Sequence, residues 1–227
     1  MSARPDTAET ALALDEVVAG YGRMTILTGT SFRVRRGTIT TIIGPNGAGK
    51  STVFKTVFGL LRTRAGRVRC DGVDITNAAP GALLANGLAY VPQGRNIFSE
   101  LSVRHNLELG GWSVRGHGDL NERIAEAVRQ FPVLEEKADQ QASVLSGGEQ
   151  KMLEVARAML LRPSVLLIDE PSIGLSPIVT KDVFTLLQGL REAGVTVLMV
   201  EQNARSALRI SDDAIVMDQG RTRMTGT

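Results

Sequence analysis

The 227-residue chain is predicted to be an α/β protein with a mostly parallel central sheet. Two observations favour this fold class. Short apolar runs rich in Val, Ile and Leu alternate with longer stretches of helical period, which is typical of strands covered by helices on both faces. The middle third, residues 93 to 163, has mostly helical patterning and lacks strong strand runs, which predicts a helical subdomain inserted into the sheet domain.

Four apolar runs predict the strands of the sheet, at residues 38–43 (TITTII), 88–91 (LAYV), 165–168 (VLLI) and 195–200 (VTVLMV). Helices are predicted at residues 50–60, 119–130, 147–161, 178–193 and 203–209. The helix from Ile178 has the clearest boundaries, because Ser176 is a suitable N-cap, Pro177 takes the first helical position and Gly194 follows the end. Its apolar stripe is Val183, Leu186, Leu187 and Leu190.

Composition excludes several classes of protein. The net charge of +2 is the difference between 26 basic and 24 acidic residues, so charge gives no indication of nucleic-acid binding. Aromatic residues make up 4%, which disfavours a base-stacking platform. No apolar run approaches the roughly 18 residues that cross a bilayer, and the polar residues 1–11 show no export signal and predict a flexible terminus. One cysteine, Cys70 at an expected strand end, excludes an internal disulfide and fits a reducing compartment.

Residues 44–51, GPNGAGKS, match GxxxxGK[ST], the pattern of a phosphate-binding loop. The match follows a predicted strand and begins a predicted helix, which disfavours the alternative of a glycine-rich turn without a ligand. Glycines let backbone N–H groups converge on phosphates, Lys50 adds a positive charge and the Ser51 hydroxyl suits Mg²⁺. The predicted phosphate-binding residues are Gly44, Pro45, Asn46, Gly47, Ala48, Gly49, Lys50, Ser51 and Thr52.

Two adjacent carboxylates, Asp169 and Glu170, follow the strand VLLI. Such a pair repels itself, so a nearby cation is expected. In a phosphate-binding-loop protein Asp169 would hold Mg²⁺ through its waters, and Glu170 would orient and deprotonate an attacking water. Taken alone, the pair is more typical of a solvated turn, but the loop at 44–51 favours the catalytic interpretation.

Gln93 and Gln202 also follow predicted strands. Because ligands of open α/β sheets bind beyond the carboxyl ends of strands, both amides are expected near the same phosphate. Gln93 could coordinate Mg²⁺ or its water and report the nucleotide state to the helical region. The alternative for either glutamine is a loop amide in solvent.

Ser146, Gly147, Gly148 and Glu149 precede a predicted helix with a stripe of Met152, Ala156, Met159 and Leu160. Ser146 and Glu149 are expected to form a capping box. The two glycines each cost about 1 kcal/mol relative to Ala in a helix, which a cap alone does not require. These four residues are therefore interpreted as a second phosphate-binding site, with the cap alone as the alternative.

In this order, GPNGAGKST, Gln93, LSGGE, VLLIDEP and Gln202 resemble an ABC-transporter ATPase subunit over nearly the whole chain. YVPQGRNIF, LSGGEQKMLEVARAM, DEPSIGLSP and VEQNARSAL further resemble the ATP-binding subunits of branched-chain amino acid transporters, whose relatives serve urea and short amides. The resemblance implies a P-loop NTPase ABC cassette with an N-terminal antiparallel β portion. It also implies one domain over 1–227, with an ATP-binding core at 12–92 and 164–227 around the helical subdomain 93–163.

The resemblance implies Mg²⁺-dependent ATP hydrolysis that drives uptake of branched-chain or other hydrophobic amino acids through a separate membrane permease. Two cassettes, of the same or different chains, would pack head to tail, with each ATP between the phosphate-binding loop of one and Ser146 to Gly148 of the other. A solute-binding protein would act indirectly, nucleic acid would not bind, and the subunit would be cytoplasmic, held peripherally at the inner membrane face by its permease. Tyr21 matches the adenine-stacking aromatic; the alternative is packing at a strand end.

Two positions depart from the wider ABC pattern. Gln202 replaces the usual switch histidine and cannot carry a proton or a positive charge, although glutamine is usual in the narrower family. Ser176 occupies the D-loop aspartate position and is already explained as an N-cap.

Two other classes stay open as alternatives. An ABC-type ATPase that acts on nucleic acid or ribosomes typically has a second cassette, heptad arms or zinc cysteines, which this sequence lacks. A nucleotide kinase would leave LSGGE unexplained. His105 and His117 are expected at the surface or in packing, and Trp112, Phe98 and Leu101 in a small core of the helical region, with permease docking as their alternative role.

Overall fold

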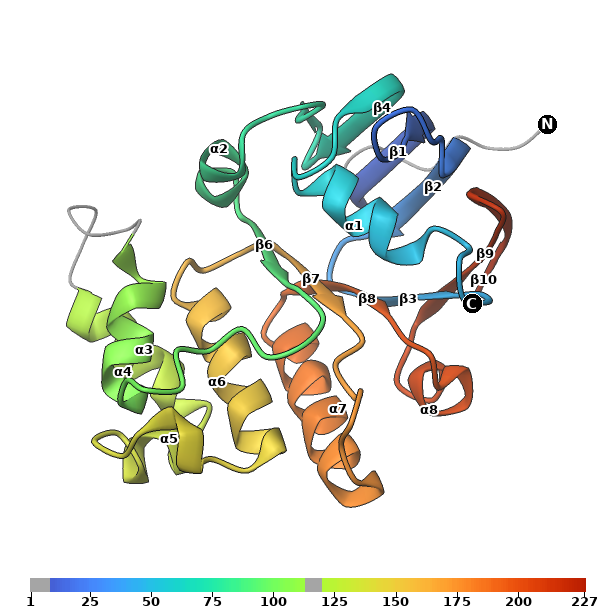
Figure 1. Ribbon diagram of the computed structural model, residues 1–227. Coiled ribbons are helices and arrows are strands. Elements are labelled where there is room, and N and C mark those ends of the chain that lie inside the picture. Colours follow the sequence, from blue (N-terminus) through green and yellow to red (C-terminus); the bar gives the residue numbers. More distant parts are fainter. Residues whose placement is uncertain (1–8, 113–119) are drawn as a thin grey trace.

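The computed structural model describes residues 9–112 and 120–227. A six-stranded sheet forms its centre (Figure 1), in the order β10 (Arg221–Gly226), β9 (Asp213–Asp218), β3 (Ile39–Ile43), β8 (Thr196–Val200), β7 (Val165–Asp169) and β6 (Leu88–Val91). All neighbours are parallel except β10, which is antiparallel to β9. Every residue of β7 and β8 is buried, which explains why these strands have continuous apolar sequences. The prediction of a mostly parallel sheet is confirmed.

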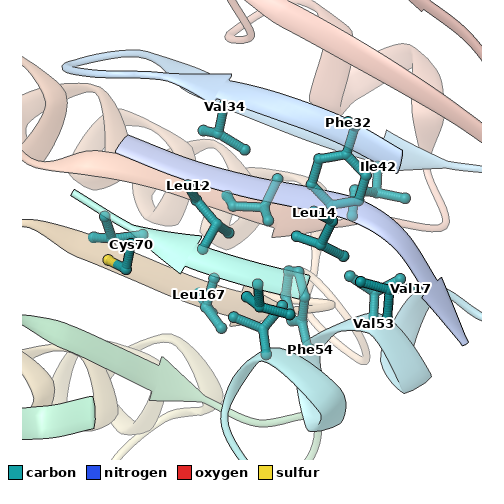
Figure 2. Packing of buried hydrophobic residues seen from close by; sticks show 14 of the residues in the cluster. Leu12, Leu14, Val17, Phe32, Val34, Ile42, Val53, Phe54, Cys70 and Leu167 are labelled. Atoms are coloured by element: carbon teal, nitrogen blue, oxygen red, sulfur yellow. The ribbon is translucent and has the colours of Figure 1, made fainter. Parts of the chain in front are cut away.

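A second sheet of four antiparallel strands lies on one side of the first, in the order β2 (Leu27–Arg35), β1 (Thr10–Ala19), β4 (Thr63–Cys70) and β5 (Val73–Asp74). This confirms the N-terminal antiparallel portion. Helix α1 (Lys50–Val57) lies between the two sheets (Figure 1). Figure 2 shows the shared core, in which Leu14 of β1, Phe54 of α1 and Leu167 of β7 belong to one buried cluster.

The two sheets are also joined by the turn between β9 and β10. The Gly220 carbonyl accepts hydrogen bonds from the Thr28 backbone N–H at 2.9 Å and from the Thr30 hydroxyl at 2.7 Å. The backbones approach so closely that a Cβ on Gly220, whose φ is +71°, would lie 1.7 Å from the Ile26 carbonyl oxygen. Glycine is therefore required where this turn meets β2.

Helices cover the other face of the central sheet around a second buried cluster. Helices α6 (Gly147–Met159) and α7 (Pro177–Glu192) contact the strands, and α3 (Val103–Gly110), α4 (Leu120–Arg129) and α5 (Pro132–Glu136) pack against α6, with a 3₁₀ turn at Ala142–Val144. Helix α2 (Pro80–Ala85) lies beside the edge strand β6, whereas α8 (Ala204–Leu208) contacts the inner strand β3 and contributes Ala207 to the second cluster. No helix within the described residues is long and apolar enough to cross a membrane.

The predicted helices are present, with ends shifted by no more than three residues. Helix α7 begins as expected: the Ser176 hydroxyl accepts from the Val179 N–H, Pro177 is the first helical residue, and Val183, Leu187 and Leu190 are buried. Helix α1 ends at Val57 instead of residue 60, because the following Gly59 adopts a φ of +71° that ends the helical path. The described residues of 93–163 form helices and turns, with one isolated β-bridge between Ser102 and Gln141.

Two expectations need correction. Residues 1–11 are not all a flexible terminus, because Thr10 and Ala11 belong to β1 and Ala11 is fully buried; the small alanines of this strand gave only a weak apolar signal. Phe98 and Trp112 are 50% and 61% exposed and do not form a core. Longer-range packing of Leu107, Leu134 and Leu153 forms the core of this region instead.

The cysteine and the two histidines were also given expected positions. Cys70 ends β4 and is buried, and His105 is exposed, as expected. His117 lies outside the described residues.

Candidate active site

The loop between β3 and α1 encloses the Lys50 ammonium, which donates to the Gly44 carbonyl at 2.8 Å and the Pro45 carbonyl at 3.0 Å. The Lys50 side chain is buried, and the turn closes through a hydrogen bond from Ala48 N–H to the Pro45 carbonyl. Gly44 has a φ of +156°, and a Cβ there would lie 2.2 Å from the Met217 carbonyl oxygen. A larger residue at this position would push the loop off β9.

A cleft of about 430 Å³ opens beside this loop, at the carboxyl ends of the parallel strands. Residues from five separate parts of the chain line it, namely Ile26, Asn46, Gly47, Gly49, Lys50, Ser51, Thr52, Gln93, Glu170, Ile173 and Gln202. The structure thus brings Gln93, Glu170 and Gln202 together with the phosphate-binding loop, as the alignment of strand ends predicted.

Asp169 is the last residue of β7; it is 1% exposed and lies behind Ser51, outside the lining of the cleft. Ser51 Oγ donates to Asp169 Oδ1 at 3.3 Å, and the Tyr90 hydroxyl donates to Oδ2 at 3.5 Å. Burial raises the pKa of Asp169, while the Ser51 hydrogen bond and the Lys55 charge oppose that rise. The hydroxyl and carboxylate oxygens side by side are the ligand types that Mg²⁺ prefers, so this donor set fits that ion.

Glu170 has an unusual backbone conformation, with a φ of +49° that non-glycine residues seldom adopt. Its N–H donates to the Val200 carbonyl at 2.9 Å, which fixes the chain at the end of β7. Gln93 Nε2 donates to Glu170 Oε2 at 2.9 Å. Burial and the charges of Asp169 and Glu201 raise the pKa of Glu170, which makes this carboxylate a better proton acceptor.

Glu201 completes the site but was not predicted from the sequence. It is 2% exposed, and its two carboxylate oxygens accept from the Ser172 N–H at 2.8 Å and the Gln202 N–H at 3.1 Å. Glu201 therefore ties the segment after Glu170 to the end of β8. Its signal was an acidic residue directly after a buried strand, the same signal that identified Asp169.

A second cleft of about 620 Å³ adjoins the first and shares Glu170, Ile173 and Gln202 with it. The segment Ser172–Leu175 and parts of α7 and α8 line the rest of it. Gln202 Nε2 donates to Asn46 Oδ1 at 3.1 Å, so the glutamine stands at the border between the two clefts. Glu170 is consequently accessible from two sides.

Comparison with known proteins identifies the chain. The model of a family described as ABC transporter matches residues 27–173. The chain belongs to this ABC transporter family. The ABC cassette is 40% identical over 216 residues to the high-affinity branched-chain amino acid transport ATP-binding protein BraG of Pseudomonas aeruginosa, covering 95% of this chain and 92% of the relative. As a member of this family, the cassette is an ATPase.

Other relatives widen the range of transported substrates. The cassette is 38% identical to the probable branched-chain amino acid transport ATP-binding protein LivF of Archaeoglobus fulgidus, over 92% of this chain and 89% of the relative. It is 33% identical to the lipopolysaccharide export ATP-binding protein LptB of Escherichia coli K12, over 95% and 90%. The ADP conformation of the ABC cassette MJ1267 superposes with a TM-score of 0.85 at 32% identity, covering 96% of this chain and 91% of that one.

Ser146 and Glu149 of this ABC cassette form the predicted capping box, with Glu149 Oε2 accepting from Ser146 N–H at 2.8 Å. Lys137 Nζ contacts Glu149 Oε1 at 2.6 Å. Burial would raise the pKa of Glu149, but these hydrogen bonds outweigh it and lower the pKa. None of the residues Ser146–Glu149 lines the cleft of the phosphate-binding loop, and Figure 1 shows the start of α6 well separated from the start of α1.

The two glycines at the start of α6 have different surroundings, which corrects part of the sequence argument. A Cβ on Gly148 would lie 2.3 Å from Val179 Cγ1 of α7, so packing requires glycine there. Gly147 is exposed, and a Cβ on it would touch Leu175 at 3.0 Å. The predicted stripe of α6 is also only partly buried: Ala156 and Leu160 are buried, and Met152 and Met159 half-buried.

Tyr21 lies outside the residues that line either cleft. It is 45% exposed, and the Lys55 ammonium lies 5.7 Å from the centroid of its ring. Its ring therefore lies near the Lys55 side chain of α1, the helix that follows the phosphate-binding loop.

Proposed function

We propose that this cassette hydrolyses Mg·ATP to drive uptake of branched-chain or other hydrophobic amino acids through a separate membrane permease. The cleft that unites Lys50, Ser51, Gln93 and Glu170 is the observation that carries the ATPase mechanism. The substrate class rests on the resemblance to BraG and LivF. LptB, at 33% identity, serves lipopolysaccharide export, so transport measurements must decide the substrate.

In the proposed mechanism the loop from Gly44 to Thr52 binds the phosphates, and the Lys50 ammonium exchanges its carbonyl partners for phosphate oxygens. Ser51 and Asp169 would hold Mg²⁺, with Gln93 beside them. The ion, when bound, neutralises charge on the phosphate oxygens.

Glu170 performs the proton transfer. A water oxygen attacks the γ-phosphorus, the bond from that phosphorus to the β–γ bridging oxygen breaks, and Glu170 accepts the water proton. The Gln202 amide donates to a γ-phosphate oxygen. Gln202 cannot share a proton with Glu170 as an imidazole would.

A second ATPase subunit, of the same or a different chain, is part of this proposal. Ser146, Gly147, Gly148 and Glu149 would bind the phosphates held by the other subunit's loop, because they lie outside this chain's own loop cleft. A related cassette, MJ0796, has been solved as a dimer bound to ADP and Pi, with a TM-score of 0.80 at 25% identity. Tyr21 would stack on adenine. The cassette would be cytoplasmic, peripheral at the membrane through its permease, and served indirectly by a solute-binding protein.

No described feature favours the alternative of an ABC-type ATPase acting on nucleic acid or ribosomes, and the net charge of +2 gives no basic surface argument for it.

Uptake by the assembled transporter in vesicles tests the proposal. We expect ATP-dependent uptake of leucine. In Glu170→Gln, ATP turnover should fall by about a hundredfold or more, because the general base is removed. Glu170→Gln should keep ATP binding and should form an ATP-dependent dimer in light scattering, alone or with a second co-encoded cassette. Unchanged turnover would rule out Glu170 as the base, and the absence of any dimer would leave Ser146 to Glu149 as a helix cap only.

A further inference from the structure

A buried ion pair on α6 lies next to the loop that carries Gln93. Lys151 Nζ contacts Glu154 Oε2 at 2.5 Å, and the two side chains are 7% and 3% exposed. A buried pair seldom adds net stability, because removing both charges from water costs about as much as their attraction gains. The pair therefore suggests a role in fixing the position of the neighbouring loop.

Glu154 uses its other carboxylate oxygen to hold the loop after Gln93. The Asn96 backbone N–H donates to Glu154 Oε1 at 2.6 Å, and Lys151 Nζ donates to the Gly94 carbonyl at 3.4 Å. The ion pair fixes the rotation of the carboxylate, and a charged acceptor strengthens the bond to the backbone N–H. Helix α6 thus contacts the loop through two side chains.

Arg157, about one turn further along α6, binds the backbone carbonyl of Asn96. Its Nη1 donates to the Asn96 carbonyl at 2.5 Å, and its guanidinium lies 5.1 Å from the centroid of the Phe98 ring. Asn96 Nδ2 in turn donates to the Pro92 carbonyl at 3.0 Å, closing the loop on itself. Both backbone groups of Asn96 are therefore bound to α6.

The other end of this loop meets the proposed general base, since Gln93 donates to Glu170 and only Gly94 and Arg95 separate Gln93 from Asn96. We propose that Glu154, oriented by Lys151, is a positioning residue that sets Gln93 against Glu170 through the Asn96 backbone. The inference rests on the proposed function, in which Glu170 accepts a proton. Displacing such a contact by about 1 Å can cost up to about a hundredfold in rate.

Two double variants isolate the hydrogen bond from the charges. Lys151→Met/Glu154→Gln removes the ion pair but keeps an oxygen acceptor for the Asn96 N–H. Lys151→Met/Glu154→Leu removes the ion pair and the acceptor at similar volume. In ATP hydrolysis by the cassette assembled with its permease, we expect kcat to fall about tenfold or more in the Leu variant and by less in the Gln variant, which keeps the acceptor but loses its orientation by Lys151, with KM for ATP unchanged in both.

The Gln93→Ala variant tests whether Glu154 affects Glu170 through Gln93. If Glu154 acts through Gln93, adding the Leu double variant to Gln93→Ala will lower kcat no further. Asn96→Ala, an exposed change that loosens the loop without disturbing the buried pair, is expected to lower kcat in the same direction. Glu126→Gln is the matched control, because it breaks only the exposed pair with Arg162, and it should leave kcat unchanged.

The outcomes separate this inference from the proposed function. Equal kcat in the two double variants, or effects that multiply with Gln93→Ala, would overturn the positioning role while loss of turnover in Glu170→Gln upheld the proposed function. Turnover that Glu170→Gln leaves unchanged would overturn both.

Discussion

Cys70 illustrates how far burial changes a single side chain. Burial, with a contribution from Asp71, raises the pKa of its thiol to about 12, so the reactive thiolate is scarce at neutral pH. We expect a thiol reagent at pH 8 to leave Cys70 unmodified in the folded protein and to label it completely in denaturant. Mass spectrometry of the labelled protein checks this, and rapid labelling without denaturant would show that β4 opens at its end.

At the same scale, the sequence identified most of the residues in the loop cleft but not their supports. The phosphate-binding loop, Gln93, Asp169 and Glu170 were found because each follows a strand or matches a spaced pattern. Glu154 was missed because it lies within a helix and accepts from the backbone N–H of the distant residue Asn96, which leaves no local pattern, whereas Glu201 was missed although it directly follows a buried strand. Their partners are known only when the chain is folded.

Helices α6 and α7 are in contact at Gly148 and Val179. Variants at this contact can distinguish a packing role of Gly148 from a role in phosphate binding. Gly148→Ala should place a methyl group against Val179 and lower the free energy of unfolding by about 1–3 kcal/mol. Adding Val179→Ala should restore most of that loss. Urea unfolding measures both changes. If the double variant regains stability but not ATP-dependent dimerisation, Gly148 serves the second phosphate site as well; if it regains both, packing alone explains the glycine.

The stability that the capping box contributes at the N-terminus of α6 is expected to depend on pH. The pKa of Glu149 is lowered overall, because the hydrogen bonds from Lys137 and Ser146 outweigh burial, so its charge stabilises the fold at neutral pH. That contribution is complete above the ordinary carboxyl pKa of about 4.3 and disappears as the pH falls through the lowered value. Glu149→Gln keeps a capping residue without the charge. Its stability should be about 1 kcal/mol below wild type at pH 7, and the difference should shrink as the pH falls through the lowered pKa of Glu149.

Urea unfolding at several pH values measures this difference. Glu136→Gln, an exposed change on α5, is the control and should match wild type throughout. A Glu149→Gln deficit that does not shrink as the pH is lowered would contradict the charge argument.

For the whole molecule, the sequence predicted the parallel sheet, its strand ends and the extra antiparallel portion, because buried strands and resemblance each give strong signals. It did not predict how the helical region packs. Phe98 and Trp112 were expected in a small core, whereas contacts between α3, α5 and α6 decide which side chains are buried. The start of β1 was also missed, since small residues give little apolar signal.

The junction at Gly220 bears on how the chain reaches this structure. Thr30 and Gly220 are bonded across 190 positions of the sequence, so β2 gains this partner only when nearly all of the chain is available. Contacts of such separation pay a large loop-closure entropy before they contribute stability, and folding slows accordingly. During synthesis, β1, β2 and β4 are made long before β9 and β10. The antiparallel sheet can therefore form its hydrogen bonds to Gly220 only after the β9–β10 turn has been synthesised.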